Sequence, residues 1–290
     1  MRDRSAAAKI PRGASPSSYR SHLSYLSHCP AAFTLLELLV VISIIAILAG
    51  LALPVFRQAK MHAMAAQSSN NLRQLVSANL AYVADHGCYA PAYDITNNRL
   101  WCGARTSGTS GYDPTQGYLA PYLGYSKMIT PDPLFTNMIT GSASFEDGSG
   151  GYGYNEVYIG GTPSYAYNAD GSLMSATPAQ VQLPTETIMF ATTAYAVAGG
   201  VQEYPFAEPP FWDFGDGPTS YRPSPSVHFR FNNKAIVAWC DGHTSMEVMT
   251  PRADGYNPNG GDANAQNLGW FGPDLDNGYW KPTHDTPPSQ

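Results

Sequence analysis

Apolar residues dominate one early segment of the chain and then recur with a helical period. Residues 33–53 read FTLLELLVVISIIAILAGLAL, and Glu37 is their one ionisable side chain. At a rise of 1.5 Å per residue this segment is about 31 Å long, which is enough to cross a bilayer. Further apolar residues follow at the spacing of one helix face, at Leu72, Leu75, Val76, Leu80 and Val83. Because Gly87 suits a helix end, the pattern predicts one helix from about residue 34 to residue 85.

The remaining residues, 88–290, lack a helical period and are divided by Gly and Pro, which is typical of strands joined by loops. The segment 227–249 predicts three consecutive antiparallel strands, with turns at Asn232-Asn233 and Asp241-Gly242. Another strand is predicted at 187–191. A sheet laid on the amphipathic helix buries the apolar face of each. The predicted fold class is therefore α+β, a long N-terminal hydrophobic helix packed on an antiparallel β-sheet domain with long loops.

Charge predicts the orientation of the apolar segment. Five basic side chains and one acid, Asp3, precede it; the bases are Arg2, Arg4, Lys9, Arg12 and Arg20. By the positive-inside rule, residues 1–32 remain cytoplasmic and the chain after Pro54 is exported. The net charge of −6 argues against a nucleic-acid partner, whose phosphates attract basic surfaces.

The start of the apolar segment resembles a known signature. Residues 32–41, AFTLLELLVV, are similar to the N-terminus of type IV pilin-like proteins and type II secretion pseudopilins. In that family a small residue precedes Phe, a carboxylate is fifth in the mature chain and Pro is twenty-second. Counting from Phe33 places Glu37 fifth and Pro54 twenty-second. One position departs from the usual pattern, because Ala32 stands where the family usually has Gly.

The resemblance implies how the chain is processed and where it resides. Prepilin peptidase would cleave between Ala32 and Phe33, and the new amine of Phe33 would be N-methylated. The leader 1–32 would be removed, which changes the net charge from −6 to −10. Residues 33–54 would form the transmembrane and assembly half of the helix, 55–87 its exported half, and 88–290 an exported β-rich domain. The protein would be a single-pass inner-membrane protein in contact with lipid, with a periplasmic or extracellular C-terminal domain.

Glu37 requires a specific explanation, because a carboxylate in hydrocarbon is costly unless it is paired or reaches water. The residue by itself leaves two explanations open. In pilin-like filaments the partner is the N-terminal amine of a neighbouring subunit, here Phe33. Alternatively, Glu37 extends to the membrane interface near the cytoplasmic end of the span. The flanking signature favours the assembly role and implies that Phe33, Glu37 and Pro54 act in assembly with other pilin or pseudopilin subunits.

Two later segments resemble one group within the prepilin-like proteins. The helix segment 70–75 and the motif Gly151-Tyr152-Gly153-Tyr154-Asn155 are similar to a group of prepilin-like proteins that end in an Asp-Gly strand hairpin. Asp241-Gly242 matches that hairpin. The group often has a His nine residues before this dipeptide, but here nine residues separate the dipeptide from Phe231, so no role is transferred to His228.

Other candidate sites are limited. Asp274, Asp276 and Asn277 place oxygen atoms near Gly278 and are a candidate calcium site, although such turns also form without metal. Cys88 and Cys102 lie in an oxidising compartment and are a candidate disulfide. No hydrolase, Walker or dinucleotide motif is present in the sequence, so we expect no enzymatic activity and no required cofactor.

The sequence thus predicts a structural pilin or pseudopilin-like subunit of a type IV pilus or type II secretion system. The alternative is a membrane-anchored binding module that uses the signal for export only. Its aromatic loops, including Trp212 and Trp270, would then hold a glycan or protein. The opposing interpretation of these aromatic side chains is that they hold long loops together.

Overall fold

The computed structural model describes residues 33–108, 110–140, 147–211, 224–250, 260–272 and 277–283. One long helix is followed by short 3-10 turns and short strands, which confirms the α+β class. The helices are α1 (Leu35–His86), η1 (Pro114–Gln116), η2 (Ala120–Tyr122), η3 (Phe135–Asn137) and η4 (Pro178–Gln180). The strands are β1 (Tyr152–Tyr154), β2 (Ile188–Thr192), β3 (Tyr195–Val197), β4 (Gly200–Gln202), β5 (Val227–His228), β6 (Lys234–Trp239), β7 (Thr244–Val248) and β8 (Leu268–Gly269).

Helix α1 agrees with the predicted helix within one residue at each end and continues through Pro54. Gly87 ends it in the left-handed conformation, with φ of +76°. Its backbone N–H donates to the carbonyl of Val83 at 2.8 Å, as expected of a C-terminal cap. The chain divides into two compact units, residues 1–53 and 54–290.

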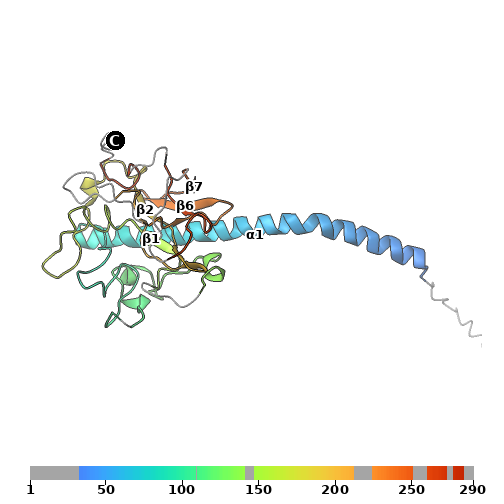
Figure 1. The fold of residues 1–290 in the computed structure, drawn as a ribbon, viewed down its shortest axis with the longest axis horizontal. Helices are drawn as coiled ribbons and strands as arrows, with labels where there is room; N and C mark the ends of the chain where they lie inside the picture. Colours follow the sequence, from blue (N-terminus) through green and yellow to red (C-terminus); the bar gives the residue numbers. More distant parts are fainter. Residues whose placement is uncertain are drawn as a thin grey trace, which may run out of the picture. The chain divides into compact units, whose positions relative to one another are not determined.

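The main sheet has the strand order β1-β2-β6-β7, and all its pairs are antiparallel. Figure 1 shows these strands beside the part of α1 that follows Pro54. The register places Ile236 opposite Met246 and Ala238 opposite Thr244. Strand β2 confirms the strand predicted at 187–191, and β6 and β7 confirm the hairpin around Asp241-Gly242.

Alternation along β6 separates two apolar clusters. Ile236 and Ala238 belong to the cluster that contains the helix residues Leu72 and Leu75. Ala235, Val237 and Trp239 belong to a second cluster, which includes Trp270 and Trp280. Because successive side chains of a strand point to opposite faces, each face of the sheet is buried. The sheet therefore packs on the helix with one face and under the C-terminal loops with the other.

Two details of the prediction were wrong. The segment 227–249 does not form three consecutive paired strands, because β5 pairs with β8 rather than with β6. Asn232 and Asn233 do form the expected turn, with φ of +52° and +61°, but the chain before it diverges toward residues 268–269. On α1, Leu80 is 40% exposed, whereas the adjacent Asn79 is fully buried. The core-facing stripe of the helix thus includes a polar residue that its apolar periodicity does not reveal.

Candidate functional site

The N-terminus of α1 is closed by a reciprocal pair of side chains. The Glu37 carboxylate accepts the backbone N–H of Thr34 at 3.0 Å and its hydroxyl at 2.9 Å. The backbone N–H of Glu37 donates to the Thr34 hydroxyl at 3.2 Å. This is a capping box, in which Thr and Glu three residues apart satisfy the free N–H groups of the first turn. Phe33 immediately precedes it, so Glu37 is held close to the residue predicted to carry the mature amine.

The helix that follows the capping box is apolar and exposed within the described residues. The side chains of Leu35, Leu36, Ile47 and Leu51 are each more than 60% exposed. The helix is long and apolar enough to cross a membrane. Pro54 lies inside α1, and Arg57 is the first basic residue after the apolar run.

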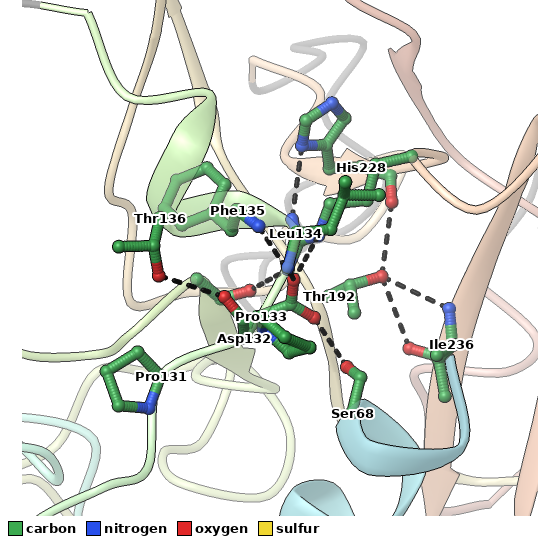
Figure 2. Close-up of polar contacts among 12 residues, drawn as sticks. Ser68, Pro131, Asp132, Pro133, Leu134, Phe135, Thr136, Thr192, His228 and Ile236 are labelled. Atoms are coloured by element: carbon green, nitrogen blue, oxygen red, sulfur yellow. Dashed lines mark hydrogen bonds and ion pairs between the residues drawn. The ribbon is translucent and has the colours of Figure 1, made fainter. Parts of the chain in front are cut away.

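A cluster of buried polar side chains joins the second half of α1 to the β-rich region. We call Ser68, Asn71, Asp132, Tyr152 and Arg230 the polar anchor. The Ser68 hydroxyl donates to Asp132 Oδ2 at 2.5 Å, as Figure 2 shows, and lies 3.2 Å from the Tyr152 hydroxyl. The Asn71 amide donates to the Tyr152 hydroxyl at 3.0 Å. These contacts fix which helix residues face the sheet, because a shifted helix would leave the buried groups unpaired.

Arg230 supplies the positive charge of the polar anchor. Its Nε lies 3.3 Å from Asp132 Oδ1, and both side chains are fully buried. The guanidinium also donates to the carbonyls of Thr193 and Gly151, at 3.1 and 2.6 Å, and lies 4.7 Å from the ring centre of Phe135. Asp132 Oδ1 in turn accepts the backbone N–H groups at the start of η3, those of Leu134 and Phe135. The buried ion pair therefore organises the loop before β1 as well as the helix contact.

His228 borders this ion pair and is constrained to its neutral form. Its Nδ1 lies 3.1 Å from Nη1 of Arg230. Because a guanidinium has no acceptor, the His228 Nδ1 must accept this hydrogen bond and cannot carry a proton. Burial, followed by the charge of Arg230, lowers the pKa of His228 well below its usual value. Burial also lowers the pKa of Arg230, an effect that the Asp132 carboxylate opposes.

A second polar contact lies further along the helix. The Asn79 amide donates to the Tyr154 hydroxyl at 2.9 Å, and its oxygen accepts the backbone N–H of Ala90 at 2.9 Å. Tyr154 donates in turn to the Ala90 carbonyl. Burial raises the pKa of Tyr154 well above its usual value, so the phenol remains a neutral donor. Asn79 and Tyr154 thus repeat, two to three turns along the helix, the attachment made by Asn71 and Tyr152.

The candidate calcium site is described only in part. Asp274 and Asp276 lie outside the described residues. The Asn277 oxygen accepts the backbone N–H of Phe211 at 2.9 Å, while its amide donates to the Phe211 carbonyl and to the Tyr158 hydroxyl. Asn277 therefore has a structural role in joining two loops. Across the described parts of the chain, no group of three or more His, Cys, Asp or Glu side chains is placed to hold a metal.

The predicted disulfide between Cys88 and Cys102 is not present. Ala92 and Trp101 face each other in a local hairpin, where the N–H of Trp101 donates to the Ala92 carbonyl. Cys88 follows the end of α1 and lies outside any strand, and Cys102 lies in the turn between Leu100 and Gly103. Cys102 is instead buried in the main core.

The aromatic side chains of the loops are mostly internal. Trp270 is fully buried and donates its indole N–H to the Glu208 carbonyl at 3.1 Å. Trp101 and Trp280 are also fully buried, and each indole donates to a loop carbonyl. Trp212 lies outside the described residues. These contacts favour the interpretation that the aromatic side chains hold the loops together, and Trp270 is not available to a ligand.

The sequence prediction missed the residues that attach the helix. No role in attachment was predicted for Ser68, Asn71 or Asn79, because polar helix residues are exposed by default. Asn71 and Tyr152 do lie in the two segments that resemble the prepilin-like group. Nothing in the sequence pairs Ser68 with Asp132, Asn71 with Tyr152 or Asn79 with Tyr154, and these partners lie 64, 81 and 75 residues away. Thr34 was also missed, although the spacing Thr-x-x-Glu before an apolar run is a recognised capping signal.

Comparison with known proteins supports the interpretation of the N-terminus. The prokaryotic N-terminal methylation motif matches residues 29–53. No curated protein and no solved structure matches the chain. The matched residues include Phe33, Thr34 and Glu37, and they cover most of the exposed apolar part of α1. The chain therefore carries a prepilin-type processing signal, of the kind cleaved by prepilin peptidase, at the start of a long apolar helix.

Proposed function

We propose that this chain is a non-enzymatic structural subunit, similar to a pilin or pseudopilin, of a type IV pilus or type II secretion system. Prepilin peptidase cleaves it before Phe33, and the mature protein remains in the inner membrane until assembly. Assembly then transfers the helix from lipid into a bundle of helices from other subunits. The observation that carries the proposal is the methylation motif on a helix whose apolar side chains have no partner in the described structure.

Glu37 has two separable roles in this proposal. As a capping residue it satisfies N–H groups of its own helix. As a charge it attracts the mature amine of Phe33 in a neighbouring copy. Glutamine at this position keeps the capping acceptor but removes the charge. The two substitutions Glu37→Gln and Glu37→Ala therefore distinguish capping from pairing between subunits.

The test measures the fraction of each variant that is recovered in sheared filaments and the fraction that remains in membranes. Glu37→Gln and Glu37→Ala are both expected to insert into the membrane and to fail in assembly. Ser43→Ala is the matched control, because Ser43 is an exposed polar residue of the same helix that donates only to the Leu39 carbonyl. Assembly of Glu37→Gln at the wild-type level would refute the pairing role.

A further inference from the structure

One loop is attached to the second half of α1 at the polar anchor, and we call its residues 130–136 the strap. The amide of Asn71 donates to the Thr130 carbonyl at 3.1 Å, and the hydroxyl of Ser68 donates to Asp132 Oδ2. Ser68 is fully buried and Asn71 is 7% exposed. Because a buried polar group is costly without a partner, the strap is what allows these two helix residues to be buried.

Two basic side chains, His228 in β5 and Arg230 just after it, contact the same strap. The Arg230 guanidinium lies 4.7 Å from the ring centre of Phe135, and its Nε lies 3.3 Å from Asp132 Oδ1. The rings of His228 and Phe135 meet edge to face, with 6.2 Å between their centres (Figure 2). His228 and Arg230 are 1% and 6% exposed. Because Phe135 packs against both, its departure with the strap would bring water to both.

The strap in its present position requires His228 to be neutral. The Nδ1 of His228 accepts a hydrogen bond from Arg230 Nη1 at 3.1 Å, and a guanidinium can only donate. The ring also makes a hydrogen bond to the backbone of Gln266. A proton on Nδ1 would replace the contact with Arg230 by two adjacent cations in a buried site. Protonation of His228 and the present position of Arg230 therefore exclude each other.

Two further titratable groups face this contact. The Asp132 carboxylate, on the strap, already offsets the charge of Arg230, and one carboxylate cannot offset a second cation as well. The Tyr152 hydroxyl, on β1, accepts the Asn71 amide at 3.0 Å. Burial, followed by the charge of Asp132, raises the pKa of Tyr152, so this phenol stays neutral in acid. Neither group therefore compensates a proton on His228.

We propose that His228 is a proton-sensitive switch for the strap. When His228 takes up a proton, Arg230 moves away from it, and the strap leaves the helix and exposes Ser68 and Asn71. The open state is the one that accepts the proton, because the departure of Phe135 gives water access to the imidazole. This inference does not depend on the proposed function, since it concerns only the β-rich region and the part of the helix that this region covers.

The sheet has contacts that do not involve the strap, so the opening is local. Strands β2, β6 and β7 pair with one another through their backbones. Trp239 of β6 packs in a cluster with Trp270 and Trp280, and no strap residue belongs to that cluster. Phe135 belongs to a separate small cluster. Opening of the strap should therefore leave the amides of β2 and β6 protected from exchange with solvent.

Proton linkage fixes how the opening depends on pH. Burial, followed by the charge of Arg230, lowers the pKa of His228 in the closed state, whereas a hydrated imidazole has a pKa of about 6.5. Above pH about 6.5 neither state binds a proton at this site, so the opening constant does not change. Below it the open state binds one proton more, and the constant rises up to about tenfold per pH unit. Between pH 7.5 and 4.5 the expected rise is about 100-fold.

Glu203 is the competing cause of an opening in acid. Its carboxylate accepts the backbone N–H of Gly148 at 2.7 Å, and burial raises its pKa. The nearby Gly150 carbonyl accepts the backbone N–H of Asp132 at 2.9 Å. Protonation of Glu203 could therefore loosen the segment 148–150 and the strap with it. Substitutions at Glu203 and at His228 distinguish the two causes.

The experiment is hydrogen exchange of the full chain in detergent at pH 7.5, 6, 5 and 4.5, with rates corrected for the intrinsic effect of pH. The strap is followed through the amides of Asp132, Leu134 and Phe135, which are hydrogen-bonded in the closed state. The variants are His228→Gln, which keeps an acceptor but cannot gain a proton, and Glu203→Gln. His243→Gln is the matched control, because His243 is half exposed and bonds to Asp241 outside the strap.

In the wild type, exchange in the strap should rise about 100-fold between pH 7.5 and 4.5, while β2 and β6 remain protected. The His243→Gln control and Glu203→Gln should show the same rise. His228→Gln should show a rise of less than about tenfold, because no group in the switch then gains a proton. Tryptophan fluorescence, which reports on the buried Trp101 and Trp270, verifies that each variant is folded.

Several results would overturn the switch. A strap that exchanges at the same corrected rate at every pH would do so, as would a rise that survives in His228→Gln. A rise lost only in Glu203→Gln would assign the opening to that carboxylate. If His228→Gln does not fold, the wild type and Glu203→Gln still decide. A rise confined to the strap in both supports the switch, and an equal rise in β2 and β6 refutes it.

Discussion

Replacing Arg230 by Met tests whether the polar anchor holds the β-rich region on the helix. Methionine has a similar length and remains apolar, so the substitution removes the charge and the donors without a large cavity. The Asp132 carboxylate then stays fully buried without its cation. The carbonyls of Thr193 and Gly151 and Nδ1 of His228 each lose a donor.

The expected loss of stability is large. Removing one partner of a buried ion pair costs about 3–5 kcal/mol, since the remaining charge is uncompensated. The Gly151 carbonyl keeps the backbone N–H of Thr193 as a donor. Each acceptor left without a donor adds a cost of about 1–3 kcal/mol unless it finds water, which places Arg230→Met near the upper end of that range. A domain is stable by about 5–15 kcal/mol in total. The substitution should therefore remove a third or more of the free energy of unfolding.

The assay is urea unfolding of the detergent-solubilised full chain, followed by tryptophan fluorescence, because Trp101, Trp270 and Trp280 are fully buried. Arg73→Met is the control, since Arg73 is exposed and bonds only to Asn70 on the same helix. The control should change the free energy of unfolding by less than about 0.5 kcal/mol.

A double substitution separates the orphaned charge from the lost packing. Asp132→Asn keeps an acceptor for the N–H groups of Leu134 and Phe135 but removes the charge. Combined with Arg230→Met, it should cost about 0.5–3 kcal/mol less than the sum of the two single substitutions. A loss below about 1 kcal/mol for Arg230→Met, or simple additivity of the two, would refute the argument that the buried pair secures the fold.

Three further predictions concern a titration, a glycine and the cysteines. The pKa of His228 is lowered in the folded state, so below pH about 6.5 the unfolded chain binds more protons than the folded chain. The free energy of unfolding should therefore decrease as the pH is lowered, by up to about 1.4 kcal/mol per pH unit. Urea midpoints measured at pH 7.5, 6 and 5 should depend less on pH for His228→Gln than for the wild type, and an equal dependence would contradict this. Gly151→Ala should destabilise by about 1–3 kcal/mol in the same assay, because φ is +85° and a Cβ would lie 2.4 Å from the ring of Phe135; a stability equal to wild type would count against the strain. Mass spectrometry of non-reduced peptides should find no peptide that joins Cys88 to Cys102, and a bridged peptide would contradict the structure, in which the two cysteines are not joined.

Local patterns in the sequence were sufficient to predict α1 and the strands β2, β5, β6 and β7, whereas β1, β3, β4 and β8 were not predicted. The helical period and Gly87 predicted α1 closely, because both signals depend on neighbours within one or two turns. The Asp241-Gly242 turn predicted the β6–β7 hairpin for the same reason. The pairing of β5 with β8 joins segments about 40 residues apart, and no local pattern specifies such a partner.

The contacts that attach α1 to the β-rich region could not be predicted either, because they too join residues that are distant in the sequence. Ser68 and Asn71 are buried because they pair with Asp132 and Tyr152, which come from a loop and from strand β1, both distant in the sequence. An isolated polar residue in a helix gives no sign of such a partner, and its default place is the surface. The capping contact at the N-terminus of α1 differs from these, because Thr34 and Glu37 are only three residues apart and their spacing could have predicted it. The sequence prediction considered only the free-energy cost of a Glu37 carboxylate in the membrane and therefore looked for a partner in another subunit, whereas the structure shows a partner three residues away, Thr34.

The most direct test of the proposed processing is the identity of the first residue of the mature protein. Top-down mass spectrometry of the native polypeptide should find a chain that begins with N-methylated Phe33. That terminus places the amine next to Thr34 and Glu37, where pairing between copies requires it. A native chain that retains residues 1–32, or one that begins after Leu53, would contradict assembly through the helix.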